Sequence, residues 1–134
     1  MAVMDASVYI ALINSNEIMH SSSWQWLEGA QKEHERIYAP VILLAEVSAA
    51  LSRGVDDPQV AHRVIQQLKG SSLIELIPVT RPLAEHAAEI AADHRIRGCD
   101  AIYVALAGQI GETLVTLDKQ QLERAAVVVP TCKP

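Results

Sequence analysis

The sequence predicts an α/β fold, in which helices cover both faces of a mostly parallel β-sheet of about five strands. Three observations carry this prediction: short apolar runs alternate with segments of helical periodicity, each run is too short for a helix, and prolines and glycines stand singly between them. Strands that alternate with helices are joined by right-handed crossovers and therefore run parallel. We expect one domain over residues 1–134, because this length can bury one core.

The strands are predicted from apolar runs near Val3 and over residues 37–38, 73–77, 113–116 and 127–129. Helical periodicity predicts helices over residues 7–13, 22–32, 41–53, 58–69, 82–95 and 101–109, with a last helix after Asp118. The segment from Pro82 shows the period most clearly, because acids recur at four-residue steps opposite its apolar side, at Glu85, Glu89 and Asp93. We expect that acidic face to be solvated.

Composition excludes several functional classes. A net charge of −5 argues against a protein that grips nucleic acid through a broad basic surface. The cations of the last two thirds leave room only for a small basic rim, or form an ordinary solvated face: Arg53, Arg63, Lys69, Arg81, Arg95, Arg97, Lys119 and Arg124. No run has membrane-spanning length, no secretory signal opens the chain, and the two cysteines lack metal-ligand spacing, so we expect a cytoplasmic protein without membrane contact.

Acidic residues follow two of the predicted strands. Asp5 comes after an apolar run in "MAVMDASVYIALI", and Asp118 comes after another in "LVTLDKQQLERAA". An Asp at the start of a helix can cap its free N–H groups, which explains each of them locally and also explains Asp100 in "RGCDAIYVALA". Ligands of parallel sheets bind beyond the carboxyl ends of the strands, however, so Asp5 and Asp118 are also candidates for a common site.

Glu46 has no such local explanation. It lies in "APVILLAEVSAAL", where it is the one polar residue between positions 39 and 47. On a helix its neighbours would be mostly apolar, and burying an unpaired carboxylate is costly. Two explanations remain open: a bound metal ion, which we favour, or a salt bridge to Arg53 two turns further along.

Together the four acids predict a site for a divalent cation. Three acids at helix starts and Glu46 within a helix can converge over the carboxyl edge of the sheet, where they would form a strongly negative pocket. Such oxygen ligands favour Mg²⁺ or Mn²⁺, whereas no His or Cys pair has the spacing of a zinc site. The chain contains no glycine-rich phosphate loop and no nucleophile elbow, so nucleotide cradling and serine chemistry have no support.

Four segments, "VMDASVYIAL", "PVILLAEVSAAL", "RGCDAIYVALA" and "TLVTLDKQQLERAA", follow one another in this order and span nearly the whole chain. In order and spacing they resemble the PIN-domain nucleases, and especially the VapC-like toxins of toxin–antitoxin pairs. Position by position, the metal-binding acidic quartet of that family matches Asp5, Glu46, Asp100 and Asp118. The small hydroxyl residues beside the quartet match Ser7 and Thr116, whereas Leu122 stands where many members carry an aromatic residue.

The resemblance implies a three-layer α/β/α sandwich whose first and fourth strands are neighbours. It also implies a metal-dependent endoribonuclease that uses Mg²⁺ or Mn²⁺ and leaves a 5′-phosphate and a 3′-hydroxyl. Asp5 and Asp100 would bind the metal directly, while Glu46 and Asp118 would complete the cage or orient the attacking water. Further implications are a cognate antitoxin, whose tail places a basic side chain in the pocket, and a homodimer. We expect single-stranded or looped RNA as substrate, because an unstacked strand reaches a narrow pocket more easily than a duplex.

Three other functions remain open. A noncatalytic PIN-like binding module would share the fold, but all four acids are present here. A PIN nuclease of RNA processing would share the site as well. A phospho-acceptor signalling domain fits poorly, because it needs adjacent acids after its first strand and an Asp after its third, whereas Asp5 stands alone and Pro78 follows "LIELI". Two tryptophans, Trp24 and Trp26, are expected in the core or, alternatively, on a partner surface.

Overall fold

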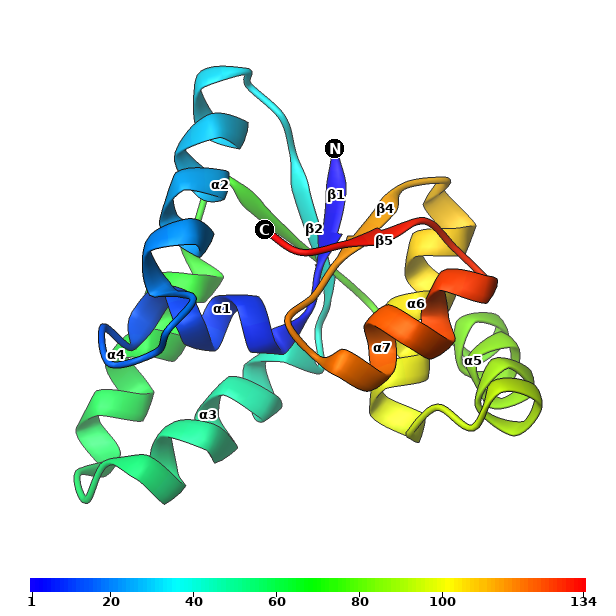
Figure 1. Ribbon diagram of the computed structural model, residues 1–134. Coiled ribbons are helices and arrows are strands. Elements are labelled where there is room, and N and C mark those ends of the chain that lie inside the picture. Colours follow the sequence, from blue (N-terminus) through cyan, green and yellow to red (C-terminus); the bar gives the residue numbers. More distant parts are fainter.

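A five-stranded sheet with the strand order β3-β2-β1-β4-β5 forms the centre of the computed structural model, which describes residues 1–134 (Figure 1). Every neighbouring pair of strands is parallel. The strands are β1 (Ala2–Met4), β2 (Ile37–Pro40), β3 (Ile74–Ile77), β4 (Thr113–Val115) and β5 (Thr131–Cys132). The α/β fold with a parallel sheet of about five strands is therefore confirmed.

Helices cover both faces of the sheet. In Figure 1, four of them lie on one side, α1 (Ala6–Ile13), α2 (His20–Lys32), α3 (Leu43–Gly54) and α4 (Pro58–Lys69). The other side carries α5 (Arg81–His94), α6 (Gly98–Ile110), α7 (Lys119–Arg124) and the short 3₁₀ helix η1 (Ala125–Val127). The three-layer arrangement agrees with the α/β/α sandwich that the family resemblance implied. None of these helices is both long and apolar enough to cross a lipid bilayer.

The fifth strand lies a few residues later than predicted. The apolar run at 127–129 does not form a strand: Val127 belongs to η1 and is 76% exposed, while Val129 is buried. β5 follows at Thr131–Cys132 and pairs with β4. The strand prediction for residues 127–129 was wrong because a short apolar run can be buried without forming a strand, as Val129 is. Hydrophobic periodicity does not distinguish such a run from a strand.

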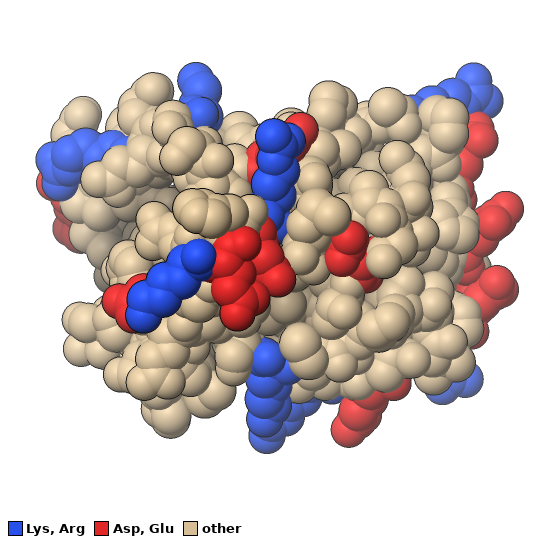
Figure 2. All heavy atoms as spheres, turned by 90° about the horizontal axis from the view of Figure 1, so that it is seen from above, with Lys and Arg blue, Asp and Glu red and all other residues tan.

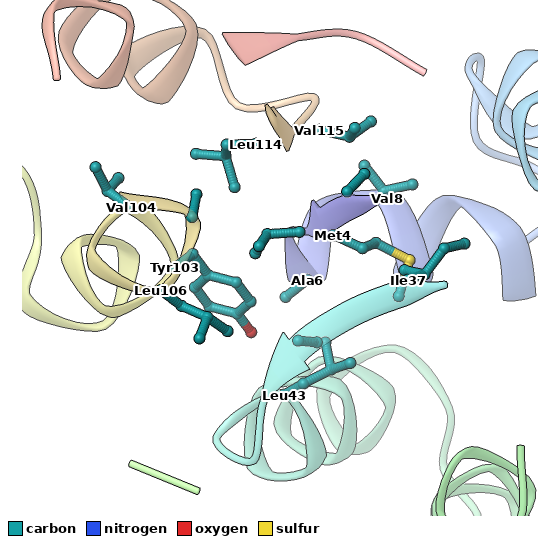
Figure 3. Close-up of a cluster of buried hydrophobic side chains, with 14 of the residues drawn as sticks. Met4, Ala6, Val8, Ile37, Leu43, Tyr103, Val104, Leu106, Leu114 and Val115 are labelled. Atoms are coloured by element: carbon teal, nitrogen blue, oxygen red, sulfur yellow. The ribbon is translucent and has the colours of Figure 1, made fainter. Parts of the chain in front are cut away.

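The core is built around β1 and α6. Six residues of α6 are fully or almost fully buried, namely Ala101, Tyr103, Val104, Ala105, Leu106 and Ala107. Figure 3 shows how Tyr103, Val104 and Leu106 from this helix meet Met4 and Leu114 of the two central strands. α6 packs against the middle of the sheet and leads into β4, so it runs in the direction opposite to the strands. Its first turn therefore lies at the carboxyl edge of the strands, where a site is expected.

The central position of β1 brings distant parts of the chain together. β1 lies between β2 and β4, so the residues that follow β1 and β4 are neighbours although they are separated by more than one hundred positions. The backbone N–H of Asp5 donates to the carbonyl of Val115 at 3.0 Å, which continues the ladder to the end of β1. The prediction that Asp5 and Asp118 share one edge of the sheet is thereby confirmed.

The face of the molecule at the amino ends of the strands carries both acidic and basic side chains. Figure 2 shows the molecule from above the amino ends of the strands, where acidic and basic side chains are scattered in small groups. Several of these groups are exposed ion pairs, such as Arg36 with Glu75 at 3.1 Å. On this face no broad basic surface is present, in agreement with the expectation from the net charge.

Candidate functional site

Asp5 and Asp118 each begin a helix at the carboxyl edge of the sheet. Asp5 is the N-cap of α1, where its side chain accepts from the backbone N–H of Ser7. Asp118 is the N-cap of α7 and accepts from the N–H groups of Gln120 at 2.8 Å and Gln121 at 3.2 Å. The local explanation from the sequence is therefore correct for both residues, but capping uses only part of their oxygen atoms.

Four donors hold the Asp5 carboxylate in a single orientation. Its Oδ2 accepts from the Ser7 hydroxyl at 2.6 Å, from the Ser7 N–H at 3.3 Å and from the Thr116 hydroxyl at 3.0 Å. Its Oδ1 accepts from the Gln121 side-chain amide at 3.0 Å. Only 4% of Asp5 is exposed. We call Asp5, Ser7, Thr116 and Gln121 the Asp5 cluster.

The Asp5 cluster is also tied to the backbone around it. Thr116 accepts from the N–H of Asp118 at 3.1 Å while it donates to Asp5, and the Ser7 hydroxyl accepts from the N–H of Leu117 at 3.0 Å. Each hydroxyl thus acts once as donor and once as acceptor. These bonds join the start of α1 to the segment between β4 and α7, so the two carboxyl ends keep a fixed distance.

The ionised form of Asp5 is unfavourable despite these donors. Burial raises the pKa of Asp5 above its usual value, and the neighbouring Asp100 carboxylate raises it further, whereas hydrogen bonds from Ser7 and Thr116 lower it. Desolvation is the largest of these effects. A positive charge near Asp5 would therefore stabilise the ionised carboxylate.

Asp100 and Asp118 are held together by one arginine. The Nε of Arg97 donates to Oδ2 of Asp100 at 2.9 Å, and its Nη2 donates to Oδ2 of Asp118 at 2.8 Å. The Arg97 side chain is 69% exposed, whereas those of Asp100 and Asp118 are 15% and 24% exposed. We call these three residues the Arg97 cluster.

Asp100 does not cap its helix, contrary to the local explanation from the sequence. The helix begins three residues earlier than expected, at Gly98, with Arg97 at the N-cap. Asp100 consequently lies in the first turn, where a carboxylate is favoured by the helix dipole. Its pKa is raised above the usual value by burial first of all, while Arg97 lowers it and Asp118 raises it.

Glu46 also differs from its expected setting. It lies in the first turn of α3 and not in the middle of the helix, because α3 begins at Leu43, and it is half-buried. The salt bridge to Arg53 does not form: the Glu46 carboxylate accepts from the Tyr103 hydroxyl at 2.6 Å. Figure 3 shows the Tyr103 hydroxyl on the side of its ring that faces α3. Glu46 is therefore oriented by a buried phenol that donates from the core.

The four acids influence one another electrostatically. Burial raises the pKa of Glu46, and the carboxylates of Asp5 and Asp100 raise it further, while Tyr103 and Arg97 lower it. Only two of the four carboxylates, those of Asp100 and Asp118, are paired with a guanidinium, that of Arg97. The negative charge of the four acids therefore exceeds the positive charge of that guanidinium. Hard oxygen donors in excess of the available positive charge are a set that suits Mg²⁺ or Mn²⁺.

The donor chemistry fits a divalent ion better than the present arrangement of the side chains does. No three His, Cys, Asp or Glu side chains are arranged so that they could hold one ion. Arg97 occupies the oxygen atoms of Asp100 and Asp118 that face each other. An ion that uses these oxygen atoms must displace the guanidinium, whereas Asp5 and Glu46 are free of any cationic partner.

Three residues of the site were missed by sequence reasoning. Arg97 appeared only as one of several scattered cations, and Tyr103 appeared only as an apolar residue of a buried helix. Gln121 lies in the polar stretch "DKQQLER", yet it is 1% exposed. A polar residue at a helical step of three from Asp118 was the one available signal, since residues at that spacing share a face.

A groove lies apart from the acids, near the two tryptophans. Trp24 is 42% exposed and lines a groove of about 480 Å³ together with residues of α1, α4 and β3, including Tyr9, Leu12 and Gln67. Trp26 is half-buried and packs against the core. The expectation of a place in the core is confirmed for Trp26 and wrong for Trp24, whose place on a partner surface stays a prediction.

Comparisons with known proteins agree with this fold. The chain is similar to the structure of the toxin VapC20 from Mycobacterium tuberculosis, described as cleaving the sarcin–ricin loop, with 19% identity, all of both chains covered and a TM-score of 0.79. It is also similar to a toxin–antitoxin complex from Klebsiella pneumoniae, with 19% identity, 100% and 98% of the two chains covered and a TM-score of 0.72. FitAcB from Neisseria gonorrhoeae gives 21% identity, 100% and 98% coverage and a TM-score of 0.71.

At such identities these structures show a common fold and no more. No curated protein sequence matches the chain. A family model, described as the PIN domain, matches residues 2–128, which include Asp5, Glu46, Asp100 and Asp118. Since that match spans nearly the whole chain, the protein belongs to the PIN-domain family.

Proposed function

We propose that the protein is a metal-dependent endoribonuclease and the toxin of a toxin–antitoxin pair, which hydrolyses RNA phosphodiester bonds in the cytoplasm. Members of the PIN-domain family are nucleases, and the toxins named above share the fold. The observation that carries the proposal is the gathering of Asp5, Glu46, Asp100 and Asp118 at one edge of the sheet with a single arginine. Such a set of carboxylates attracts cations, and helix capping by Asp5 and Asp118 does not account for Glu46.

In this proposal Asp5 and Asp100 hold the metal directly, and Glu46 and Asp118 complete the cage or orient the attacking water. The chemistry that Mg²⁺ or Mn²⁺ supplies at such a site is charge neutralisation and a lowered pKa of water. The chain itself keeps the carboxylates oriented, through Ser7, Thr116 and Gln121 on Asp5 and through Tyr103 on Glu46. Single-stranded or looped RNA is the substrate that such an edge admits most easily.

A cognate antitoxin and a homodimer belong to the same proposal. Structures of similar fold include toxin–antitoxin complexes, among them VapBC2 of Rickettsia felis bound to a DNA fragment from its promoter. An antitoxin side chain that carries a positive charge would find acceptors on Asp5 and Glu46, which have no cation of their own. Light scattering of the purified chain, alone and with the product of a neighbouring gene, measures both assemblies.

The proposed activity is tested with purified, partner-free protein and a mixed RNA pool, with Mn²⁺, Mg²⁺ or EDTA. We expect cleavage that requires the metal and that Asp5→Asn reduces by about 100-fold or more, because a ligand of the ion is lost. Asp93→Asn is the matched control, since Asp93 is an exposed acid of α5 away from the site.

Each outcome of this experiment has a meaning. Cleavage lost in Asp5→Asn and kept in Asp93→Asn supports the nuclease. Cleavage that persists in EDTA or in Asp5→Asn contradicts it. Metal binding by calorimetry without cleavage of any RNA favours the noncatalytic binding module, and RNA cleavage without growth arrest on expression favours a nuclease of RNA processing.

A further inference from the structure

Gln121 is the most deeply buried amide of the site, and only the nitrogen of its side-chain amide forms a hydrogen bond. Its Nε2 donates to Oδ1 of Asp5 at 3.0 Å, while its Oε1 is buried and has no hydrogen-bond partner. The other groups that contact the Asp5 carboxylate, the hydroxyl and N–H of Ser7 and the hydroxyl of Thr116, also donate to it, so its oxygen atoms act as acceptors. The N–H side of the amide must therefore face Asp5, and the oxygen is left without a donor.

Packing alone does not explain a glutamine at this position. A buried acceptor without a partner lowers stability, and a leucine or methionine of similar size would fill the same space without that cost. Buried polar atoms without partners are rare, and in this chain the hydroxyl of Ser23 in α2 is the other one. The unpaired Oε1 therefore indicates that the other half of the amide is needed.

The position of Gln121 between two acids suggests what that need is. Asp5 follows β1 and Asp100 belongs to α6, so the two carboxylates reach the edge of the sheet from different elements. Gln121 contacts Asp5 and also lines a small hollow that Asp100 shares with Gln120, Ile96 and the arginines Arg95, Arg97 and Arg124. A neutral amide can orient one carboxylate beside another without neutralising either of them, which a lysine or arginine cannot do.

We propose that Gln121 is a positioning residue of the nuclease site, whose amide holds Asp5 in the orientation required for a divalent cation shared with Asp100. This inference rests on the proposed function, because it assigns the residue a role toward the metal. Gln121 touches neither the substrate nor the ion in this role and acts through Asp5, while its amide also lowers the pKa of the neighbouring Asp100 carboxyl. Partners of this kind contribute to affinity by fixing the orientation of a ligand.

The test uses the full chain with Gln121→Leu and Gln121→Met, which remove the donor and keep the size. We expect the affinity for Mn²⁺, measured by calorimetry, to fall about 10- to 100-fold in both variants. The thermal midpoint in EDTA should be unchanged or higher, because the unpaired Oε1 is removed as well. Gln109→Leu, the same exchange at an exposed position of α6, is the control and should change neither quantity.

A structural role and a positioning role give different results. Weaker Mn²⁺ binding together with a clearly lower thermal midpoint in both variants indicates a merely structural glutamine and overturns the inference. Unchanged Mn²⁺ affinity in both variants overturns it too, but leaves the proposed function intact. If the wild-type chain itself binds no Mn²⁺, the metal site of the proposed function fails, and the inference fails with it.

Discussion

The Asp5 cluster and the Arg97 cluster hold acids in opposite ways. In the Asp5 cluster, one buried carboxylate is surrounded by four neutral donors from three parts of the chain. In the Arg97 cluster, two partly exposed carboxylates share one exposed guanidinium. Neutral donors orient a charge without cancelling it, whereas the arginine cancels charge and can be exchanged for another cation.

The difference assigns separate tasks to the two clusters. The Asp5 cluster cannot rearrange without breaking buried hydrogen bonds, so in the proposed function it is the part that fixes the position of the cation. The Arg97 cluster can open at little cost, because an exposed ion pair contributes little to stability. Arg97 thus stabilises the acidic edge in the absence of a metal, and the Asp5 cluster keeps the edge ready for one. Three measurements examine this division.

Thr116→Val should have the largest effect, because it disrupts the Asp5 cluster from within. Thr116 is fully buried, and the exchange removes a donor to Asp5 and an acceptor for the N–H of Asp118. We expect a loss of about 2 to 3 kcal/mol in the free energy of unfolding. Urea unfolding at pH 7 in EDTA measures it, with Thr113→Val, at the start of β4, as control. Equal midpoints for the wild type and Thr116→Val would show that Thr116 does not hold Asp5.

The second measurement follows the pH dependence that Asp5 produces. Burial raises its pKa in the folded protein above the usual value of an aspartate, so the folded state binds this proton more tightly than the unfolded chain does. The free energy of unfolding of the wild type therefore falls relative to that of Asp5→Asn as the pH rises from about 4 through the raised pKa. Each pH unit by which folding raises the pKa corresponds to about 1.4 kcal/mol. Above that pKa the difference is constant.

Urea unfolding of both proteins between pH 4 and pH 8 in EDTA measures this difference. Asp93→Asn, which removes a carboxyl from the exposed face of α5, serves as the reference. A difference that stays flat, or that shrinks as the pH rises, would mean that the donors of the Asp5 cluster outweigh its burial. The comparison between the two clusters would then lose its physical basis.

Arg97→Gln should have the smallest effect on stability. The exposed pairs to Asp100 and Asp118 are lost, which we expect to change the free energy of unfolding by less than about 1 kcal/mol. Affinity for Mn²⁺ should rise by roughly 3- to 10-fold at low salt, because the carboxylate oxygens no longer have a competing cation. Arg81→Gln, which breaks the exposed pair with Glu85, is the control. Weaker Mn²⁺ binding in Arg97→Gln would indicate that the arginine assists the ion.

Most of the fold could be predicted because its signals are local. Short apolar runs separated by helical periodicity located four of the five strands and all seven α-helices within a few residues. The fifth strand was misplaced because η1 and β5 divide a short segment in which Val129 is buried and Val127 is exposed. Which of these residues pairs with β4 is decided by the geometry of the sheet edge, and that has no signature in the sequence.

In the site, too, only the residues with a local signal in the sequence could be predicted. Asp5 and Asp118 were recognisable because each ends an apolar run, and Glu46 because it interrupts one. The partners of these acids were not recognisable, since Tyr103 and Gln121 meet them only in the folded chain, across 57 and 116 positions. Arg53, the alternative partner of Glu46 that helical spacing offered beside the favoured metal ion, lies on the exposed part of α3, whereas a tyrosine from another helix supplies the bond.

The central position of β1 also sets the order of events during synthesis. β1 is the first strand to be made, but one of its two neighbours, β4, is made more than one hundred residues later. Until residues 113–121 have left the ribosome, Asp5 lacks Thr116 and Gln121, and neither Asp100 nor Glu46 has its place beside it. Closing so long a loop comes late in folding. Within this chain, Asp5 therefore has its complete set of hydrogen-bond donors only after β4 and α7 have been made.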